Sequence, residues 1–147
     1  MRKSATPDDK RKHLKFIQDV INRLSSNTFL LKGWSITIIG AIFTATLTTG
    51  NYNLLWVILG AVLIFWFIDA YYLALERRYR NLYSRVAELS ADKIDYSMKT
   101  PKLTFLAWFE AFRRPVLVMF YGVVLLIVAG FLVSNNFDIS LIIKVKE

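Results

Sequence analysis

Residues 54–91 read LLWVILGAVLIFWFIDAYYLALERRYRNLYSRVAELSA, and this stretch organises the rest of the chain. It begins as a membrane span with one acid, Asp69, near its end, and it continues as a charged segment without glycine or proline. As one helix it measures about 55 Å at a rise of about 1.5 Å per residue, whereas the bilayer hydrocarbon is only about 30 Å thick. We therefore expect about 25 Å of this helix to stand clear of the membrane as a stalk.

The N-terminal segment is predicted to be a second helix that pairs with this stalk. Thr6-Pro7-Asp8-Asp9 is a typical helix start, with threonine as N-cap, proline at the first position and acids in the first turn. Apolar residues then recur at spacings of three and four in both segments: Leu14, Ile17, Ile21 and Leu24, and Tyr72, Leu75, Tyr79, Leu82, Val86 and Leu89. We expect the two seams to meet as an antiparallel pair; an N-terminal helix lying on anionic lipid is the alternative.

The first span, residues 28–48, has an unusual face of small and hydroxyl-bearing residues at helical spacing. Its members include Thr37, Gly40, Thr44 and Thr48. Small residues let helices approach closely, and hydroxyls bond across the gap or back to their own helix. Such a face is either a helix–helix contact or the lining of a narrow pore, and in an oligomer one face can be both.

Asp69 is the acid of the second span, residues 54–75. A carboxylate within a span usually faces protein or water and has a partner. We expect it to lie near the membrane boundary on the same side as Lys32 and to pair with Lys32, an arginine or a tyrosine. The alternative interpretation is an acid that gates or binds ions.

The whole chain is predicted to be an all-α membrane protein with three transmembrane helices, the first two extended into a cytoplasmic helical stalk, and a short interfacial helix. Trp and Phe beside Arg113-Arg114 indicate that interfacial helix, and Pro115 starts the third span. The expected segments are a cytoplasmic amphipathic basic helix (1–27), the spans 28–48 and 54–75, the stalk and a polar turn (76–100, the turn at 92–100), the interfacial amphipathic helix (101–114), the third span (115–134) and an external tail (135–147) that begins with a polar turn.

The distribution of lysine and arginine predicts the orientation. Residues 1–32 hold eight of these bases, residues 76–114 hold nine, the turn between the first two spans holds none, and the tail holds two. Because bases near span ends stay on the cytoplasmic side, the N-terminus and residues 76–114 are expected in the cytoplasm. The turn and the C-terminus are expected outside, as parts of a multi-pass membrane protein.

The sequence contains no pattern that indicates an enzyme. Cysteine is absent, and His13 is the single histidine, expected to be a solvated helix residue. Nucleotide-binding, serine-hydrolase and metalloprotease motifs are missing as well. We therefore expect no catalytic residues, no metal and no cofactor.

A basic cluster in the cytoplasmic segments is the candidate binding site. It consists of Lys12, Lys15, Arg77, Arg78, Arg80 and Arg85, with Tyr79, Tyr83 and Tyr96 near them in sequence. Positive charge with interleaved aromatic rings suits a polyanion, either lipid headgroups or single-stranded nucleic acid. The alternative is that membrane topology alone accounts for these bases.

Two stretches carry a resemblance to known proteins: HLKFIQDVINRLSSNTFLLKGWSITIIGA from His13 and FWFIDAYYLALERRYRNLYSRV up to Val86. They resemble a group of small bacterial three-span proteins of anti-phage defence operons, in particular the membrane effectors of Hailong systems. The resemblance implies a tetrameric channel held shut by single-stranded DNA oligomers that a partner nucleotidyltransferase makes. It rests on overall pattern and assigns no individual DNA contacts.

The resulting hypothesis is an oligomeric inner-membrane channel effector whose cytoplasmic basic helices sense a nucleic acid. In it, Thr37, Thr44 and Thr48 belong to the pore face, and Asp69 with Lys32 forms a buried pair linking stalk to span. A non-conducting membrane scaffold that docks a soluble partner through its cytoplasmic helices is the alternative. A lipid-sensing anchor is the third interpretation. The expected partners are the bilayer, further copies of the chain and a single-stranded DNA oligomer.

Overall fold

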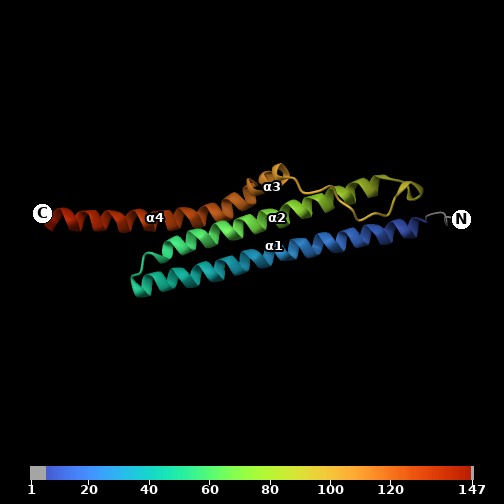
Figure 1. The fold of residues 1–147 in the computed structure, drawn as a ribbon. Helices are drawn as coiled ribbons and strands as arrows, with labels where there is room; N and C mark the ends of the chain where they lie inside the picture. The colour runs from blue at the N-terminus through green and yellow to red at the C-terminus, as the bar shows by residue number, and fades with distance from the viewer. Residues whose placement is uncertain (1–5, 147) are drawn as a thin grey trace. The chain divides into compact units, whose positions relative to one another are not determined.

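The computed structural model describes residues 6–146, with side chains for residues 6–134, and this part of the chain is helical without strands (Figure 1). Its elements are α1 (Pro7–Thr49), α2 (Leu54–Glu88), the 3₁₀ helix η1 (Ala91–Lys93), α3 (Phe105–Phe112) and α4 (Pro115–Lys146). Three helices are long and apolar enough to cross a membrane: α1, α2 and, in α4, Pro115–Ser134. The expectation of an all-helical chain with three membrane-spanning helices is thereby confirmed.

The start of α1 follows the predicted capping pattern. The backbone N–H of Asp9 donates to Oγ1 of Thr6 at 3.2 Å, and the N–H of Thr6 donates to Oδ2 of Asp9 at 3.0 Å. This reciprocal arrangement is a capping box, which satisfies two backbone donors at the open end of the helix. The helix ends at Thr49 and is followed by Gly50, whose φ of 66° lies in the left-handed region that glycine adopts without strain.

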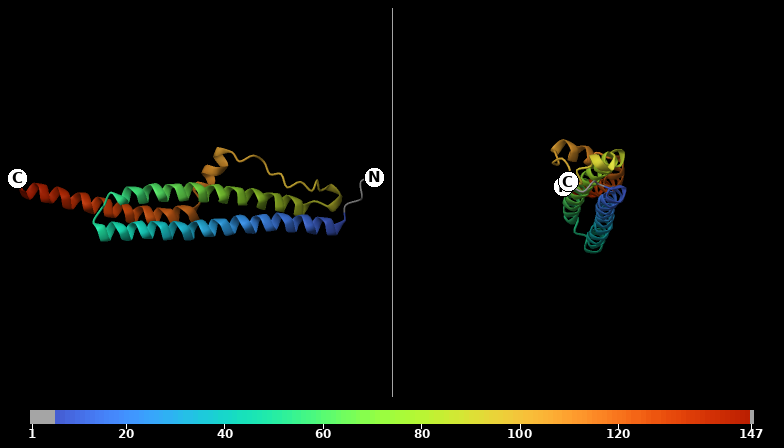
Figure 2. Two further views of the ribbon diagram at one scale, coloured as in Figure 1. Left: turned by 60° about the horizontal axis from the view of Figure 1, so that its bottom comes forward. Right: turned by 90° about the vertical axis from the view of Figure 1, so that its right-hand side faces the viewer.

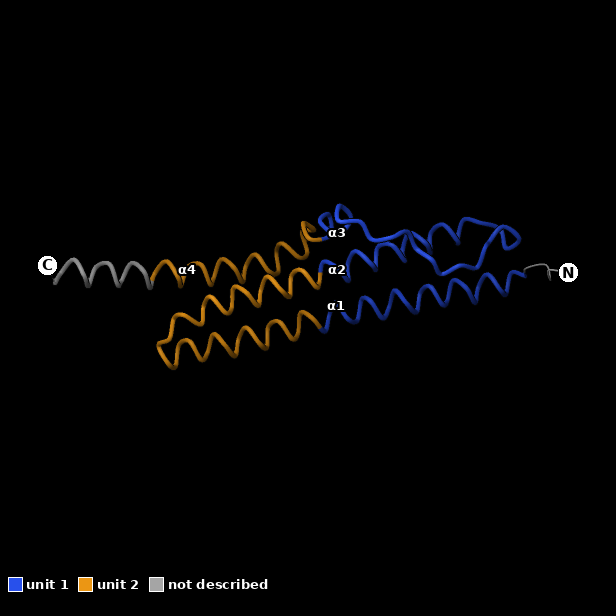
Figure 3. The backbone as a smooth tube through the Cα atoms, viewed as in Figure 1, with its two compact units in different colours: residues 1–30, 70–111 blue, residues 31–69, 112–147 orange. Residues whose placement is uncertain are grey.

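The chain divides into two compact units, and α1 and α2 contribute to both (Figure 3). Unit 1 comprises Met1–Leu30 and Ala70–Ala111, and unit 2 comprises Leu31–Asp69 and Phe112–Glu147. Each unit has its own buried residues.

In unit 1, the seams of α1 and α2 pack on each other as the sequence predicts. Ile17 and Ile21 of α1 form a buried cluster with Leu82 and Val86 of α2. The ammonium of Lys10 donates to the backbone oxygens of Ala87 and Leu89 at 2.8 and 2.7 Å. The lysine thus caps the C-terminal end of α2, where the last carbonyls lack helical partners and the helix dipole favours a cation.

The region after α2 differs from the expectation of a polar turn followed by a helix over 101–114. After η1, residues 94–104 form a segment without helix or strand, here called the strap, and α3 begins only at Phe105. Figure 2 shows the strap returning beside α2. The physical reason is burial: Ile94 joins the core cluster and Tyr96 and Met98 pack against it. Thr104 then caps α3, accepting the N–H of Ala107 on its Oγ1 at 3.3 Å.

In unit 2, segments of α1, α2 and α4 share a core. Its fully buried side chains are Ser35 and Thr46 from α1, Leu55, Ile58, Val62 and Asp69 from α2, and Leu117, Tyr121 and Val128 from α4. The helix α4 also continues to Lys146, so the polar turn expected at the start of the 135–147 tail is absent. Residues 134–138 contain neither glycine nor proline, the residues that interrupt helices most strongly. Side chains of the tail lie outside the described residues.

Candidate functional site

Unit 1 contains a cleft between α2 and the strap, which we call the basic cleft. The helix contributes Arg78, Asn81, Leu82 and Arg85 at spacings of three and four, so that they share one face. The strap contributes Lys99, Thr100 and Pro101. These residues line a cavity of about 80 Å³.

The lining of the basic cleft is strongly cationic. Arg78, Arg85 and Lys99 contribute three positive charges, and the residues that line the cavity include no acid. The Nε atom of Arg78 is buried and has no hydrogen-bond partner among the described residues. A buried guanidinium donor without an acceptor is costly, and an anion supplies the acceptor by a charge-assisted hydrogen bond. The arrangement is therefore chemically suited to binding an anionic oxygen group.

A second cavity adjoins the basic cleft and is larger, about 230 Å³. The two cavities share Leu82, Arg85 and Lys99 as lining residues. The remaining walls of the second cavity combine apolar and polar side chains, namely Val86, Leu89 and Ile94 with Lys93, Asp95 and Ser97. The two cavities thus form a basic compartment and a mixed compartment that meet at Arg85 and Lys99.

Of the six bases predicted to bind a polyanion, the structure brings Arg78 and Arg85 together at the basic cleft. Lys12 instead pairs with Asp8 at 2.9 Å, and Arg80 pairs with Glu76 at 2.7 Å. The hydrogen bond from Lys12 holds the pKa of Asp8 below its ordinary value of 3.8 and raises the pKa of Lys12. Neither cavity lining includes these two bases.

The two other predicted bases also lie outside the linings of both cavities. Lys15 is exposed on α1, and Arg77 is half-buried on α2. Of the six bases predicted to form a polyanion site, the structure therefore places only two, Arg78 and Arg85, in the lining of the basic cleft.

Sequence reasoning missed Asn81, Lys99 and Thr100 in the basic cleft. A signal for the strap residues exists in residues 94–99, IDYSMK, where apolar and polar residues alternate. Period-two alternation indicates an extended segment with one buried face. That pattern would have placed Ile94, Tyr96 and Met98 on the core and Lys99 on the polar face.

The tyrosines proposed to stack on nucleic-acid bases pack on the core of unit 1. Tyr79, Tyr83 and Tyr96 all contact the buried cluster. Burial is the main cause that raises the pKa of Tyr96, and its hydroxyl donates to the backbone oxygen of Ala91 at 3.2 Å. These rings are half-buried and stabilise the unit, so they do not form a fully exposed stacking platform.

His13 is buried, contrary to the expectation of a solvated residue. It is 5% exposed, and its ring meets the ring of Tyr96 edge to face at a centroid distance of 5.4 Å. Its position is one turn before Ile17 on the buried face of α1, which accounts for the burial. Its Nε2 atom has no hydrogen-bond partner in the described part of the chain.

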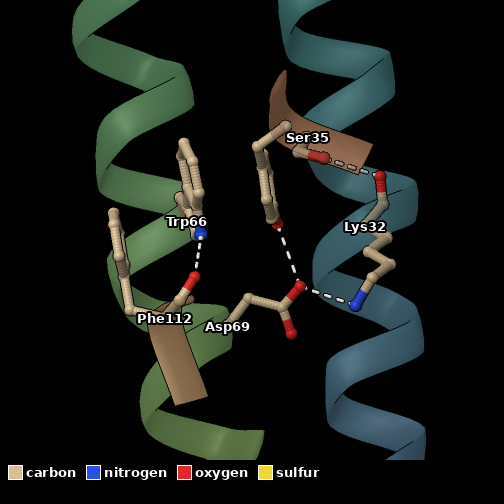
Figure 4. A network of polar contacts seen from close by, with 6 residues as sticks. Lys32, Ser35, Trp66, Asp69 and Phe112 are labelled. Carbon is tan, nitrogen blue, oxygen red and sulfur yellow. Dashed lines mark hydrogen bonds and ion pairs between the residues drawn. The ribbon is translucent and has the colours of Figure 1, made fainter. Parts of the chain in front are cut away.

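Unit 2 contains the ion pair that the sequence suggested for Asp69 (Figure 4). Nζ of Lys32 lies 2.6 Å from Oδ2 of Asp69, and the hydroxyl of Tyr121 donates to the same oxygen at 3.1 Å. Asp69 is wholly buried, whereas the Lys32 side chain is 20% exposed. The three residues come from α2, α1 and α4, so one carboxylate joins all three helices of the unit.

A layer of aromatic rings lies next to this pair. Nε1 of Trp66 donates to the backbone oxygen of Phe112 at 3.0 Å, as Figure 4 shows. The indole stacks on the ring of Phe112 at 4.4 Å and on the ring of Tyr121 at 5.7 Å. This layer holds the end of α3 and the start of α4 against α2 and orients the Tyr121 hydroxyl toward Asp69.

The face of α1 that carries small and hydroxyl-bearing residues is exposed in the described part of the chain. The hydroxyls of Thr37, Thr44 and Thr48 donate to backbone oxygens of Gly33, Gly40 and Thr44 at 2.9–3.0 Å. Thr37, Gly40, Thr44 and Thr48 are all exposed. Each hydroxyl proton is thus used within the helix, and the lone pairs of the oxygen remain available outward.

No protein-family model matches the chain, and neither does any curated protein or solved structure. Within the described residues, no group of three or more His, Cys, Asp or Glu side chains is placed to hold a metal ion. The basic cleft, the buried ion pair and the exposed face of α1 are the features of the chain that bear on its function.

Proposed function

We propose that the chain is an oligomeric ion channel of a bacterial inner membrane and an effector of anti-phage defence, held closed by a cytoplasmic single-stranded DNA oligomer. The observation that carries this proposal is the convergence of Arg78, Arg85 and Lys99 on one cavity without an acid in its lining. Phosphates are the anions that arginine and lysine recognise most readily in nucleic acids. The resemblance of residues 13–86 to defence effectors supplies the context.

The charge distribution supports a cytoplasmic location for unit 1. Seventeen of the nineteen lysines and arginines lie in residues 1–32 and 76–114. By the positive-inside rule these segments stay in the cytoplasm, where a nucleotidyltransferase product is available. The basic cleft would then face the compartment that contains its ligand.

The exposed face of α1 supports an oligomeric pore. Cyclic symmetry repeats one face of each subunit around a common axis, and small residues allow the helices to approach closely there. Thr37, Thr44 and Thr48 would place hydroxyl oxygens around that axis, with Gly40 between them. Oxygen ligands can replace part of the hydration shell of a passing cation.

The proposal is tested by ion flux from proteoliposomes that contain the full chain. Flux is expected without ligand and is expected to fall when a hexathymidylate is added on the cytoplasmic side. The variant Arg78→Gln/Arg85→Gln should conduct but lose this inhibition, whereas Lys15→Gln, an exposed base outside the cleft, should behave like the parent. A chain that shows no flux in any ligand state is a scaffold, and that result overturns the proposal. Flux unaffected by the oligonucleotide overturns the proposed ligand.

A further inference from the structure

The two cavities of unit 1 differ in size and in chemistry in a way that fits the two parts of a nucleotide. Deepening the proposed function, on which this inference rests, we propose that the basic cleft binds the terminal phosphate of a nucleic-acid strand, a phosphomonoester, and that the adjoining cavity takes the nucleoside attached to it. The site would then recognise a strand end and would not follow the backbone of a strand.

The arrangement of the cations favours one phosphate over a run of phosphates. Proteins that follow a single strand use a positively charged groove along the backbone with exposed aromatic rings for successive bases. Here Arg78, Arg85 and Lys99 converge on a single cavity of about 80 Å³. The nearby tyrosines are packed on the core cluster and supply no such platform.

The charge of the cleft favours a monoester. A phosphomonoester has a charge of about −1.5 to −2 at pH 7 and three strong acceptor oxygens, which match three cationic side chains. An internal phosphodiester has less charge and fewer free oxygens. The buried Nε of Arg78, which has no partner among the described residues, would gain an acceptor from the phosphate.

The adjoining cavity suits the rest of a nucleotide. Its volume of about 230 Å³ exceeds that of the basic cleft, and Val86, Leu89 and Ile94 give it apolar walls that fit a flat ring. Asp95 and Ser97 provide polar atoms at the same cavity. Because Arg85 and Lys99 line both cavities, a phosphate held by them lies next to the space for its own nucleoside.

A ligand bound in this way would hold the strap against α2. One wall of the cleft comes from α2, while Lys99 and Thr100 come from the strap. The strap continues directly into α3 and then α4. Binding would therefore restrain the segment of chain that leads into the third membrane-spanning helix. Through this restraint the ligand could control opening of the channel.

The test compares binding of three hexathymidylates to the full chain in lipid nanodiscs: one with a 5′-phosphate, one with a 3′-phosphate and one with two hydroxyl ends. A phosphorylated end is expected to increase affinity at least tenfold at pH 7.5. This advantage should shrink at pH 5.5, where a monoester whose second pKa is about 6 loses part of its charge. Arg78→Gln and Lys99→Gln should abolish the advantage, and Lys15→Gln should retain it, with circular dichroism showing that each variant is folded.

The outcomes separate the end-recognition inference from the proposed function. Equal affinity for all three oligonucleotides, lost in Arg85→Gln, leaves oligonucleotide sensing intact and overturns recognition of the end. If the preference for a phosphorylated end persists in Arg78→Gln and Lys99→Gln, the terminal phosphate does not bind in this cleft. Absence of binding by all three overturns both proposals.

Discussion

The ammonium of Lys32 lies 2.6 Å from Oδ2 of Asp69, a carboxylate that is wholly buried between α1, α2 and α4. Charges in the apolar part of a membrane protein are costly unless paired. The pair is therefore a point at which the three helices of unit 2 depend on one another, and removing one partner leaves the other charge poorly compensated.

Asp69→Asn keeps the shape of the side chain but removes the negative charge. We expect it to destabilise the detergent-solubilised protein by about 3 kcal/mol, because the Lys32 ammonium, whose side chain is only 20% exposed, then lacks a counterion. The double variant Lys32→Met/Asp69→Asn should recover part of the loss. The midpoint of thermal unfolding of both proteins measures the effect. Tyr121→Phe, which deletes one hydrogen bond to the carboxylate but keeps the ion pair, is the control and should cost less, about 2 kcal/mol.

Ile94→Ala tests the packing of the strap. Ile94 is 7% exposed and is the strap residue buried in the core cluster, so truncation should cost about 2 kcal/mol and release the strap. Limited trypsin digestion should then cut faster after Lys93, Lys99 and Lys102. Asp95→Asn, on the neighbouring exposed residue, should leave the cleavage rate unchanged. Unchanged cleavage in Ile94→Ala would contradict the observed packing.

Lys10→Met removes the cap at the end of α2. The variant loses hydrogen bonds to the backbone oxygens of Ala87 and Leu89, and we expect a local cost of about 1 kcal/mol. Amide hydrogen exchange in the last turn of α2 should therefore accelerate about fivefold. Lys15→Met, at an exposed position of α1, should not change it. Equal exchange in the two variants would show that the cap contributes nothing.

The helical elements were largely predictable because their signals are local. The Thr6–Asp9 start, the uninterrupted apolar runs and the spacings of three and four in the two seams all act within one or two turns of helix. The pairing of Asp69 with Lys32 could also be predicted, because a buried carboxylate needs a cation and few lysines or arginines were expected near Asp69. The fit of one seam to the other follows from their matching periodicity.

Only part of the basic cleft could be predicted from the sequence. Arg78 and Arg85 stand out as bases on one helical face, but the count of charges does not separate them from Lys12 or Arg80, which are paired with acids on their own helices. Lys99 reaches the cleft through the strap, whose course depends on burial of Ile94. Such a contact between distant segments has no local signal beyond the short apolar–polar alternation. His13 was misjudged although its position one turn before Ile17, on the buried face of α1, is a local signal; only its ring contact with Tyr96 of the strap is non-local.

The ion pair between Asp8 and Lys12 predicts how the first turn of α1 responds to acid. The hydrogen bond from Lys12 holds the pKa of Asp8 below 3.8 in the folded chain. A group with a lowered pKa stabilises the fold above its unfolded pKa and loses that contribution as the pH falls through the folded value. The N-terminal turn should therefore keep its full stabilisation above about pH 4 and lose it at lower pH.

Lys12→Gln should return the pKa of Asp8 toward its ordinary value, because the hydrogen bond from Lys12 is the largest cause of the shift. The measurement is an NMR titration that follows the side-chain carboxyl carbon of Asp8 in the full chain. Lys15→Gln is the matched control, since this base is exposed on α1 and is not among the causes of the shift. An Asp8 titration midpoint that is the same in Lys12→Gln and in the parent would show that the pair does not form in solution.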